Sequence, residues 1–287
     1  MSLIYVLQNT QVFFISFFFI IGLIAGSFLN VVIYRLPRML DREWRQQCAG
    51  LTGDTIDVSL QPFNLFLPHS ACPHCGHKIT ALENIPVAGY VVLGGHCSQC
   101  RASISVRYPA IEVLTGFIGG FTAWHFGYGF AAFAALVFIW ALIALACIDM
   151  DTQLLPNEIT LPMLWVGLLV NLSEGFTDIR SAIIGAVAGY LILWSVYWCF
   201  KLITGKEGVG YGDFKLLAVI GAWLGWQMLP LVILFSSVAG SVLGVGLIIM
   251  AKRGRHTPIP FGPYLAGGGL LALFWGNQIN RVYFGLL

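Results

Sequence analysis

Long apolar runs constrain the fold of this chain more than any other feature. Eight apolar stretches can be read as membrane spans, for which about 20 residues suffice, although the fourth is short and contains Pro162 and the sixth starts with charged residues. They cover residues 12–34, 108–126, 129–148, 158–173, 181–202, 213–229, 230–251 and 260–285. Only 10% of the residues are charged, against about 25% in an ordinary soluble domain. The sequence therefore predicts an all-α polytopic membrane protein with about eight transmembrane helices.

The positions of Lys and Arg predict how these spans are oriented. Loops on the cytoplasmic side of a membrane are enriched in basic residues. If the long loop after the first span is cytoplasmic, thirteen basic residues lie inside and only Arg180 and Arg281 lie outside. This bias supports eight spans with both termini outside, in a bacterial cytoplasmic (inner) membrane. The first span follows no basic residue and is too long for a cleaved signal peptide, so we expect it to be an anchor.

The polar insert at residues 35–107 contains two pairs of cysteines. Cys72 and Cys75 form one C-x-x-C knuckle, and Cys97 and Cys100 form the other. Two such knuckles are typical of a zinc ribbon, in which four thiolates complete a tetrahedron around the metal. Two disulfides are the alternative, but they are rare in a reducing cytosol. We therefore expect a small cytoplasmic zinc-ribbon-like insert with one structural zinc per chain.

Three histidines, His74, His77 and His96, lie beside the knuckles. Each could replace a thiolate as a ligand, although a place at the surface or in support of the site is the simpler interpretation. The net charge of +2 gives no reason to expect a nucleic-acid partner.

Two carboxylates lie at the ends of apolar segments. Asp149 ends the third span and Asp213 opens the sixth, so the predicted topology places both on the cytoplasmic side at a similar depth. An ionisable group inside a membrane costs about 2.5–3.5 kcal/mol on insertion scales, which is why such groups usually have a function. Two acids that meet can share a proton and activate water, as in aspartic proteases. Each acid alone has a simpler interpretation as a headgroup-level residue or a helix cap.

Other charged residues near these acids have less specific interpretations. We expect Asp151 to be solvated and Glu112 to be exposed at the interface. Lys215 is a candidate counter-ion for Asp213, although the spacing of two residues is poor for pairing within a helix. Gly210 and Gly212 flank the approach to Asp213 and allow the backbone to come close to a substrate.

The chain resembles the bacterial type IV prepilin peptidases, which are aspartic membrane proteases with a GxGD motif and also N-methyltransferases. The resemblance covers almost the whole chain, and its motifs occur in the same order as in that family. They are residues 26–37 (GSFLNVVIYRLP), the double cysteine knuckle, residues 107–112 (RYPAIE), Asp149 with Pro156 and Asn157, residues 208–216 (GVGYGDFKL) and residues 258–264 (PIPFGPY).

The resemblance implies that Asp149 and Asp213 are the catalytic acids. It further implies that the substrates are type IV prepilins and the pseudopilins of type II secretion, whose basic leaders are removed before S-adenosylmethionine methylates the new terminus. Asn157 stands where many relatives carry Asp. The methyltransferase activity rests on the resemblance alone. Gly94 and Gly95 are candidates for binding S-adenosylmethionine, with a turn before the second knuckle as the alternative.

These inferences divide the chain into a first transmembrane segment (1–34), a cytoplasmic insert with the metal site (35–107) and a seven-helix protease domain (108–287). A proton-coupled transporter that uses the two acids as a relay is the main alternative function. A scaffold whose zinc ribbon binds a partner is another. The position of both acids at one interface, without an obvious internal repeat, favours the enzyme. The sequence does not determine the oligomeric state.

Overall fold

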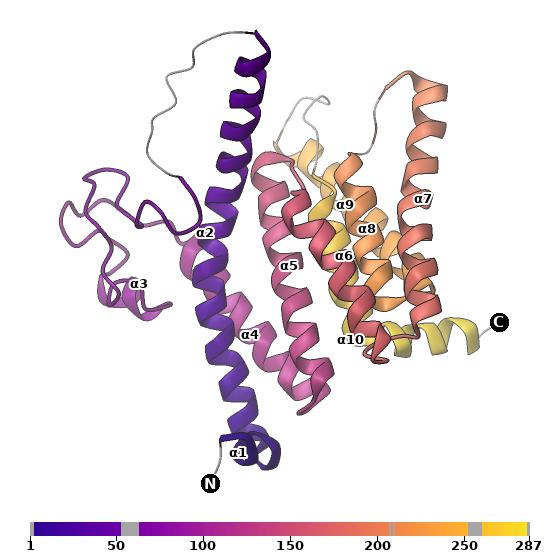
Figure 1. Ribbon diagram of the computed structural model, residues 1–287, viewed down its shortest axis with the longest axis horizontal. Coiled ribbons are helices and arrows are strands. Elements are labelled where there is room, and N and C mark those ends of the chain that lie inside the picture. Colours follow the sequence, from indigo (N-terminus) through magenta and orange to yellow (C-terminus); the bar gives the residue numbers. More distant parts are fainter. Residues whose placement is uncertain (1–2, 53–62, 207, 209, 252–259, 286–287) are drawn as a thin grey trace. The chain divides into compact units, whose positions relative to one another are not determined.

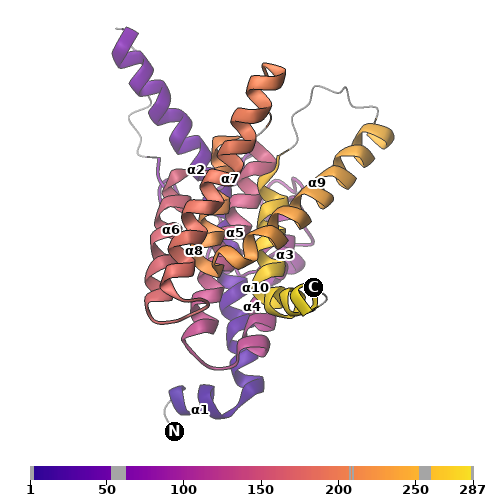
Figure 2. The same ribbon diagram turned by 90° about the vertical axis from the view of Figure 1, so that its right-hand side faces the viewer.

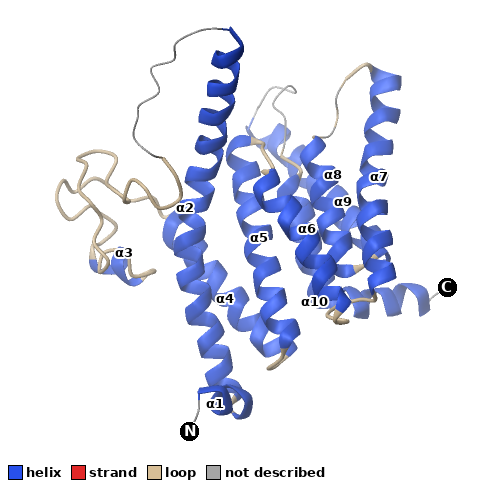
Figure 3. Cartoon of the chain, in the orientation of Figure 1, coloured by secondary structure: helices blue, strands red, loops and turns tan. Residues whose placement is uncertain are grey.

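Helices account for all the regular secondary structure that is described apart from two isolated bridges. The computed structural model describes residues 3–52, 63–206, 208, 210–251 and 260–285, and these residues contain no β-strand (Figures 1 and 3). The chain divides into two compact units, Met1–Ala132 and Phe133–Leu287. The chain is an all-helical, multi-pass membrane protein, as the sequence predicts.

The first unit contains four helices and the start of a fifth. They are α1 (Leu3–Asn9), α2 (Gln11–Thr52), α3 (Ala88–Val92), α4 (Arg107–Phe126) and the first residues of α5 (Phe130–Thr152). The second unit contains the rest of α5 and the later elements. They are α6 (Asn157–Leu172), α7 (Ile179–Thr204), α8 (Tyr211–Leu224), the 3₁₀-helix η1 (Trp226–Met228), α9 (Leu229–Ala251) and α10 (Gly262–Gly285).

Seven of the eight predicted spans each coincide with one α-helix, whereas the span at 213–229 covers α8 and η1 with a break at Gly225. Among the described residues, four helical stretches have the length and hydropathy to cross a membrane. They are Gln11–Leu51, Phe130–Thr152, Ile179–Thr204 and Trp226–Gly246, and the apolar helix Asn157–Leu172 is shorter. The number of eight spans therefore remains a prediction.

Helix α2 continues far beyond the predicted span, from residue 34 to Thr52. The apolar run ends near Tyr34, but the next residues are mostly good helix formers. Asp41 and Arg45 also form an i, i+4 ion pair of 3.0 Å on the exposed surface. Hydropathy marks where a membrane segment ends, whereas the end of a helix depends on local propensity.

Close packing of α2 on α4 holds the first unit together. A Cβ atom added to Gly22 would lie 2.6 Å from the Thr115 carbonyl oxygen, and one added to Gly26 would lie 2.7 Å from the Glu112 Cα. Small residues at such contacts let two membrane helices approach closely and gain van der Waals contact. Asn30 adds a hydrogen bond from its side-chain amide to the Tyr108 carbonyl, at 3.1 Å.

The second unit is built around α8, which packs against α6, α7 and α10 (Figure 2). Gly189 of α7 lets the two backbones meet, because a Cβ there would lie 2.6 Å from the Leu217 carbonyl oxygen. Trp223 of α8 is fully buried, stacks on Phe138 at a centroid distance of 4.7 Å and donates its indole N–H to the Met163 carbonyl. The end of α5 and the starts of α8 and α10 lie at the same end of this unit (Figure 1).

Candidate active site and metal centre

The four cysteines of the insert converge on one point. Their Sγ atoms all lie within 4.8 Å of one another. The Sγ atoms of Cys72 and Cys100 are 3.7 Å apart, and those of Cys75 and Cys97 are 3.9 Å apart. A zinc–sulfur bond of 2.3 Å in a tetrahedron places neighbouring sulfurs about 3.8 Å apart. These distances fit a four-thiolate zinc site and are too long for disulfide bonds, and all four cysteines are free.

The two knuckles have the same backbone hydrogen bonds. In each, the first cysteine donates to the carbonyl five residues later, and the residue four positions on donates back to that cysteine. A third bond runs from the residue seven positions on to the carbonyl two positions before the cysteine. The bonds are Cys72 to His77, Gly76 to Cys72 and Ile79 to Ser70 in the first knuckle, and Cys97 to Ala102, Arg101 to Cys97 and Ile104 to Gly95 in the second.

This repeated pattern turns the backbone so that two sulfurs of each knuckle point the same way. The turn requires a left-handed residue at the fourth position after the first cysteine. Gly76 occupies it in the first knuckle with φ of 73°, and Arg101 occupies it in the second with φ of 60°. Glycine adopts this conformation freely, whereas for Arg101 it is strained.

Glu83 connects the two knuckles. Its carboxylate accepts hydrogen bonds from the Thr80 N–H at 2.8 Å and hydroxyl at 2.9 Å, and it lies 3.2 Å from His77 Nε2. Hydrogen bonds from Ser98, within the second knuckle, and from Thr80 lower the pKa of Glu83 to about 2. The carboxylate therefore stays ionised and fixes both loops. Among the described residues the converging group consists of the four cysteines, and His77 contacts Glu83, so neither His74 nor His77 takes the place of a thiolate.

Gly94 and Gly95 lie in a turn that leads into the second knuckle. Their φ values are 61° and 74°, and the Gly95 N–H donates to the Tyr90 carbonyl at 2.9 Å. A Cβ on Gly95 would meet the Tyr90 hydroxyl at 2.9 Å, whereas nothing lies within 4 Å of a Cβ on Gly94. The turn alone explains these two glycines, and the space beside Gly94 is open.

Asp149 and Asp213 come together in the second unit. Asp149 is in the last turn of α5 and is 5% exposed, and Asp213 is in the first turn of α8 and is 6% exposed. They are close enough for the charge of one to act on the other. Two buried acids on separate helices thus lie near each other in the same unit.

Asp149 is held by a residue far away in the sequence. Its Oδ2 accepts a hydrogen bond of 2.9 Å from the N–H of Gly262, the first residue of α10. A Cβ at Gly262 would lie 2.7 Å from that oxygen, so only glycine fits without a shift. Gly262 belongs to the motif at residues 258–264, for which the sequence suggested no role. Pro258 and Ile259 of that motif lie outside the described residues.

Asp213 is held locally. Its Oδ2 accepts a hydrogen bond of 3.1 Å from the N–H of Gly210, which precedes α8. Gly212 packs on the loop between α5 and α6, because a Cβ there would lie 2.7 Å from the Leu155 Cβ. Both acids therefore accept a backbone N–H from the start of a helix, where the helix dipole favours a carboxylate. Val209 of the same motif is not among the described residues.

The structure places the other charged candidates differently. The sequence suggested that Glu112 is exposed, but the structure shows that it is buried. Its carboxylate accepts the Val87 N–H at 2.7 Å and so joins the insert to α4. Lys215 donates to the Asn157 Oδ1 at 2.7 Å, across α8 and α6, instead of pairing with Asp213. Asp151 is exposed, as expected.

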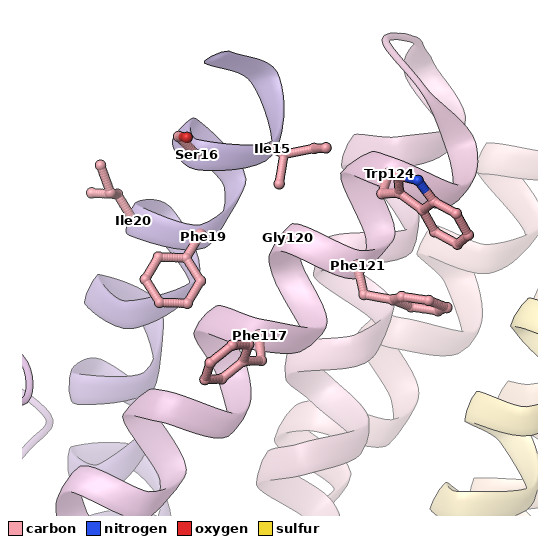
Figure 4. A pocket seen from close by; sticks show the side chains of 8 residues that line it. All are labelled: Ile15, Ser16, Phe19, Ile20, Phe117, Gly120, Phe121 and Trp124. Atoms are coloured by element: carbon pink, nitrogen blue, oxygen red, sulfur yellow. The ribbon is translucent and has the colours of Figure 1, made fainter. Parts of the chain in front are cut away.

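An open pocket of about 570 Å³ lies in the first unit between α2 and α4 (Figure 4). Its lining is apolar and aromatic except for Ser16, whose hydroxyl donates a hydrogen bond of 2.9 Å to the Val12 carbonyl. The lining residues are Ile15, Ser16, Phe19, Ile20, Phe117, Gly120, Phe121 and Trp124. No titratable group lines it, so it offers nothing for acid–base chemistry.

Two family models match the chain. The bacterial peptidase A24 N-terminal domain matches residues 20–126, and the type IV leader peptidase family matches residues 136–245. No solved structure matches.

Named relatives match nearly the full length. The chain is 55% identical to a prepilin leader peptidase/N-methyltransferase of Stutzerimonas stutzeri over 92% of this chain and 91% of the relative. It is 54% identical to one from Aeromonas hydrophila, over 93% of both chains, and 52% identical to one from Pseudomonas aeruginosa, over 92% and 91%. The chain therefore belongs to the type IV leader peptidase family of enzymes.

Proposed function

We propose that this chain removes the basic leader of type IV prepilins and of type II secretion pseudopilins at the cytoplasmic face of the inner membrane. It then methylates the new N-terminal residue. The observation that supports this most is the meeting of two buried carboxylates, Asp149 and Asp213, from two different helices of the second unit. The family and the names of the relatives supply the substrate class.

The chemistry we propose needs both acids. One, protonated, donates a hydrogen bond to the scissile carbonyl, while the other, ionised, takes a proton from the attacking water. Close carboxylates resist double ionisation and therefore share a proton. In each acid Oδ2 accepts a glycine N–H, so in this proposal Oδ1 is the oxygen that meets the water or the scissile carbonyl. The titration belongs to the pair rather than to either residue.

The proposed place of cleavage follows from charge. A basic leader stays on the cytoplasmic side by the same rule that orients the spans. The scissile bond between leader and apolar helix then lies near the inner interface. Both acids lie at helix ends that the predicted topology puts on that side. In this proposal residues 108–287 supply the protease helices and residues 35–107 supply the metal site.

The insert serves methylation in this proposal. The methyl donor is S-adenosylmethionine, with Gly94 and Gly95 as the candidate contacts because the space at Gly94 is open. The four cysteines would hold one zinc ion. Its role is structural, because four thiolates leave no coordination position for a substrate.

Incubation of a purified prepilin with this protein and S-adenosylmethionine, followed by mass spectrometry, tests the proposal. We expect loss of the leader and gain of a methyl group. Asp149→Asn and Asp213→Asn should each lower the cleavage rate by at least about 100-fold, as expected for removal of a general acid–base group. Each variant should remain folded and membrane-inserted.

Three outcomes would contradict parts of the proposal. A single Asp→Asn variant with near-wild-type cleavage removes that residue from the pair. Cleavage without methylation leaves a protease and removes the role given to the insert. No cleavage by folded wild-type protein would favour a proton relay instead, which a proton-flux assay in liposomes measures.

A further inference from the structure

A buried tyrosine on α7 lies next to the turn that carries Asp213. Tyr197 is 1% exposed, and its hydroxyl oxygen accepts two hydrogen bonds. One comes from the Lys201 ammonium at 3.0 Å, and the other comes from the Tyr211 hydroxyl at 3.2 Å. The first is charge-assisted, and such bonds are stronger than neutral ones.

Tyr211 brings this contact to the proposed active site. It is the first residue of α8 and lies two residues before Asp213. Its ring is 5.1 Å from that of Tyr197 and 5.5 Å from that of Phe214, between centroids. Phe214 follows Asp213 and is fully buried. The Tyr197 ring of α7 thus packs on both Tyr211 and Phe214, the residues that flank Gly212 and Asp213.

The chain around the start of α8 is rich in glycine. Glycines occupy positions 205, 208, 210 and 212, and glycine loses more backbone freedom on ordering than any other residue, so side-chain contacts that hold this turn have more freedom to restrict. The Gly210 N–H contact to Asp213 lies within the same turn, so it shapes the turn without attaching it to a neighbouring helix. Tyr211 is 52% exposed, so burial alone does not hold its ring in place.

We infer that Tyr197 is a positioning residue for Asp213. Its hydroxyl holds the Tyr211 side chain, and with it the first turn of α8, so that the Asp213 carboxyl stays beside Asp149. This inference rests on the proposed function only in taking Asp213 as a reacting group. In this inference Tyr197 acts on Asp213 through Tyr211, whose hydroxyl donates to the Tyr197 hydroxyl.

The test compares Tyr197→Phe with Tyr190→Phe. Both substitutions remove one hydroxyl from α7, and both rings pack on Phe214 at 5.8 Å, but the Tyr190 hydroxyl takes no part in the contact with Tyr211. We expect Tyr197→Phe to lower kcat for prepilin cleavage about tenfold with KM within about twofold, because misplacing a reacting group by about 1 Å can cost 100-fold. Tyr190→Phe should stay near wild type.

A double-variant cycle tests the route through Tyr211. Tyr211→Phe should also lower kcat, and the double variant should be no worse than Tyr197→Phe, since both remove the hydrogen bond between the two hydroxyls and Tyr197→Phe also removes the one from Lys201. Additive losses in the cycle would overturn the inference. So would a wild-type kcat in Tyr197→Phe, or an equal loss in Tyr190→Phe.

Hydrogen exchange provides a readout that does not depend on cleavage. Tyr197→Phe should speed amide exchange in peptides that cover residues 210–214 more than Tyr190→Phe does, in folded protein in detergent or nanodiscs. Unchanged exchange there would overturn the inference even if prepilin proved to be the wrong substrate. Conversely, faster exchange with an inactive wild type would count against the proposed function alone.

Discussion

The four-cysteine cluster and the carboxylate pair are built in opposite ways. Each cysteine knuckle makes its own hydrogen bonds within about ten residues of chain and repeats the same pattern in the other. The carboxylate pair draws on three helices, and Asp149 receives its N–H from Gly262, 113 residues away. The cluster is thus assembled mainly by local backbone geometry, and the pair by the packing of membrane helices.

This difference predicts that the two sites fail independently. The insert has few buried apolar side chains, so we expect its fold to depend on the proposed metal. The acids lie among fully buried residues such as Phe214 and Ile148, so their surroundings persist when one carboxyl becomes an amide. Variants at one site should therefore leave the other intact, and three predictions follow this logic.

Loss of the metal should have the largest effect. Wild-type protein should contain about one zinc per chain, Cys72→Ser should lose most of it, and the insert should unfold, because structural zinc supplies about 10–16 kcal/mol to small domains. Asp213→Asn should keep its zinc. Elemental analysis by mass spectrometry gives the metal content, and limited proteolysis of residues 63–106 reports the fold.

Cys48→Ser is the matched control, since Cys48 lies on the exposed part of α2 outside the cluster. Wild-type protein that lacks metal after mild purification, with protected cysteines, would refute the zinc site.

Disturbing the long-range support of Asp149 should have the next largest effect. In Gly262→Ala the added Cβ would lie 2.7 Å from Oδ2 and push the carboxyl away. We expect cleavage to fall about tenfold or more, since small displacements of reacting groups are costly. Zinc content should not change.

Gly267→Ala is the control on the same helix, because a Cβ there meets Phe235 at an ordinary 3.5 Å. If both variants cleave prepilin at the same rate, the Gly262 contact does not position Asp149.

The smallest effects should come from the paired left-handed positions of the knuckles. Arg101→Gly relieves a strained φ of 60° and should stabilise the insert by about 1 kcal/mol, the usual scale for a left-handed non-glycine residue. Gly76→Ala should destabilise it by a similar amount, because its φ is 73° and no clash adds to the strain. Thermal unfolding of the metal-bound protein compares them. A less stable Arg101→Gly would show that the arginine side chain stabilises the fold.

Much of the fold was predictable because its signals are local. Every apolar run is mostly helical, and the cysteine spacing indicated one cluster, since each knuckle needs only its own turn. The extension of α2 was missed because hydropathy detects apolar segments and gives no signal for a polar helix. The burial of Glu112 was missed because its partner, the Val87 N–H, is a backbone group in another segment.

The carboxylate pair was predictable only in part. Topology placed Asp149 and Asp213 on one side of the membrane, because alternating spans bring every second loop to the same face. Nothing in the residues around Gly262 indicated that its N–H binds Asp149. Likewise, the sequence does not distinguish Tyr197 from the other aromatic residues of its apolar helix. Only the structure shows that its hydroxyl accepts hydrogen bonds from Tyr211 and Lys201.

By itself the sequence determined what depends on neighbours along the chain. These are the helical segments, the two metal knuckles and the presence of two acids at span ends. Hydrophobicity, spacing and charge are properties of short windows and need no folded partner to be read. The tertiary structure alone decided that the Gly262 N–H holds Asp149 and that the Tyr197 hydroxyl meets Tyr211. Those contacts form between helices, and how helices pack depends on how the side chains of several segments fit together. No single segment of the sequence determines that fit.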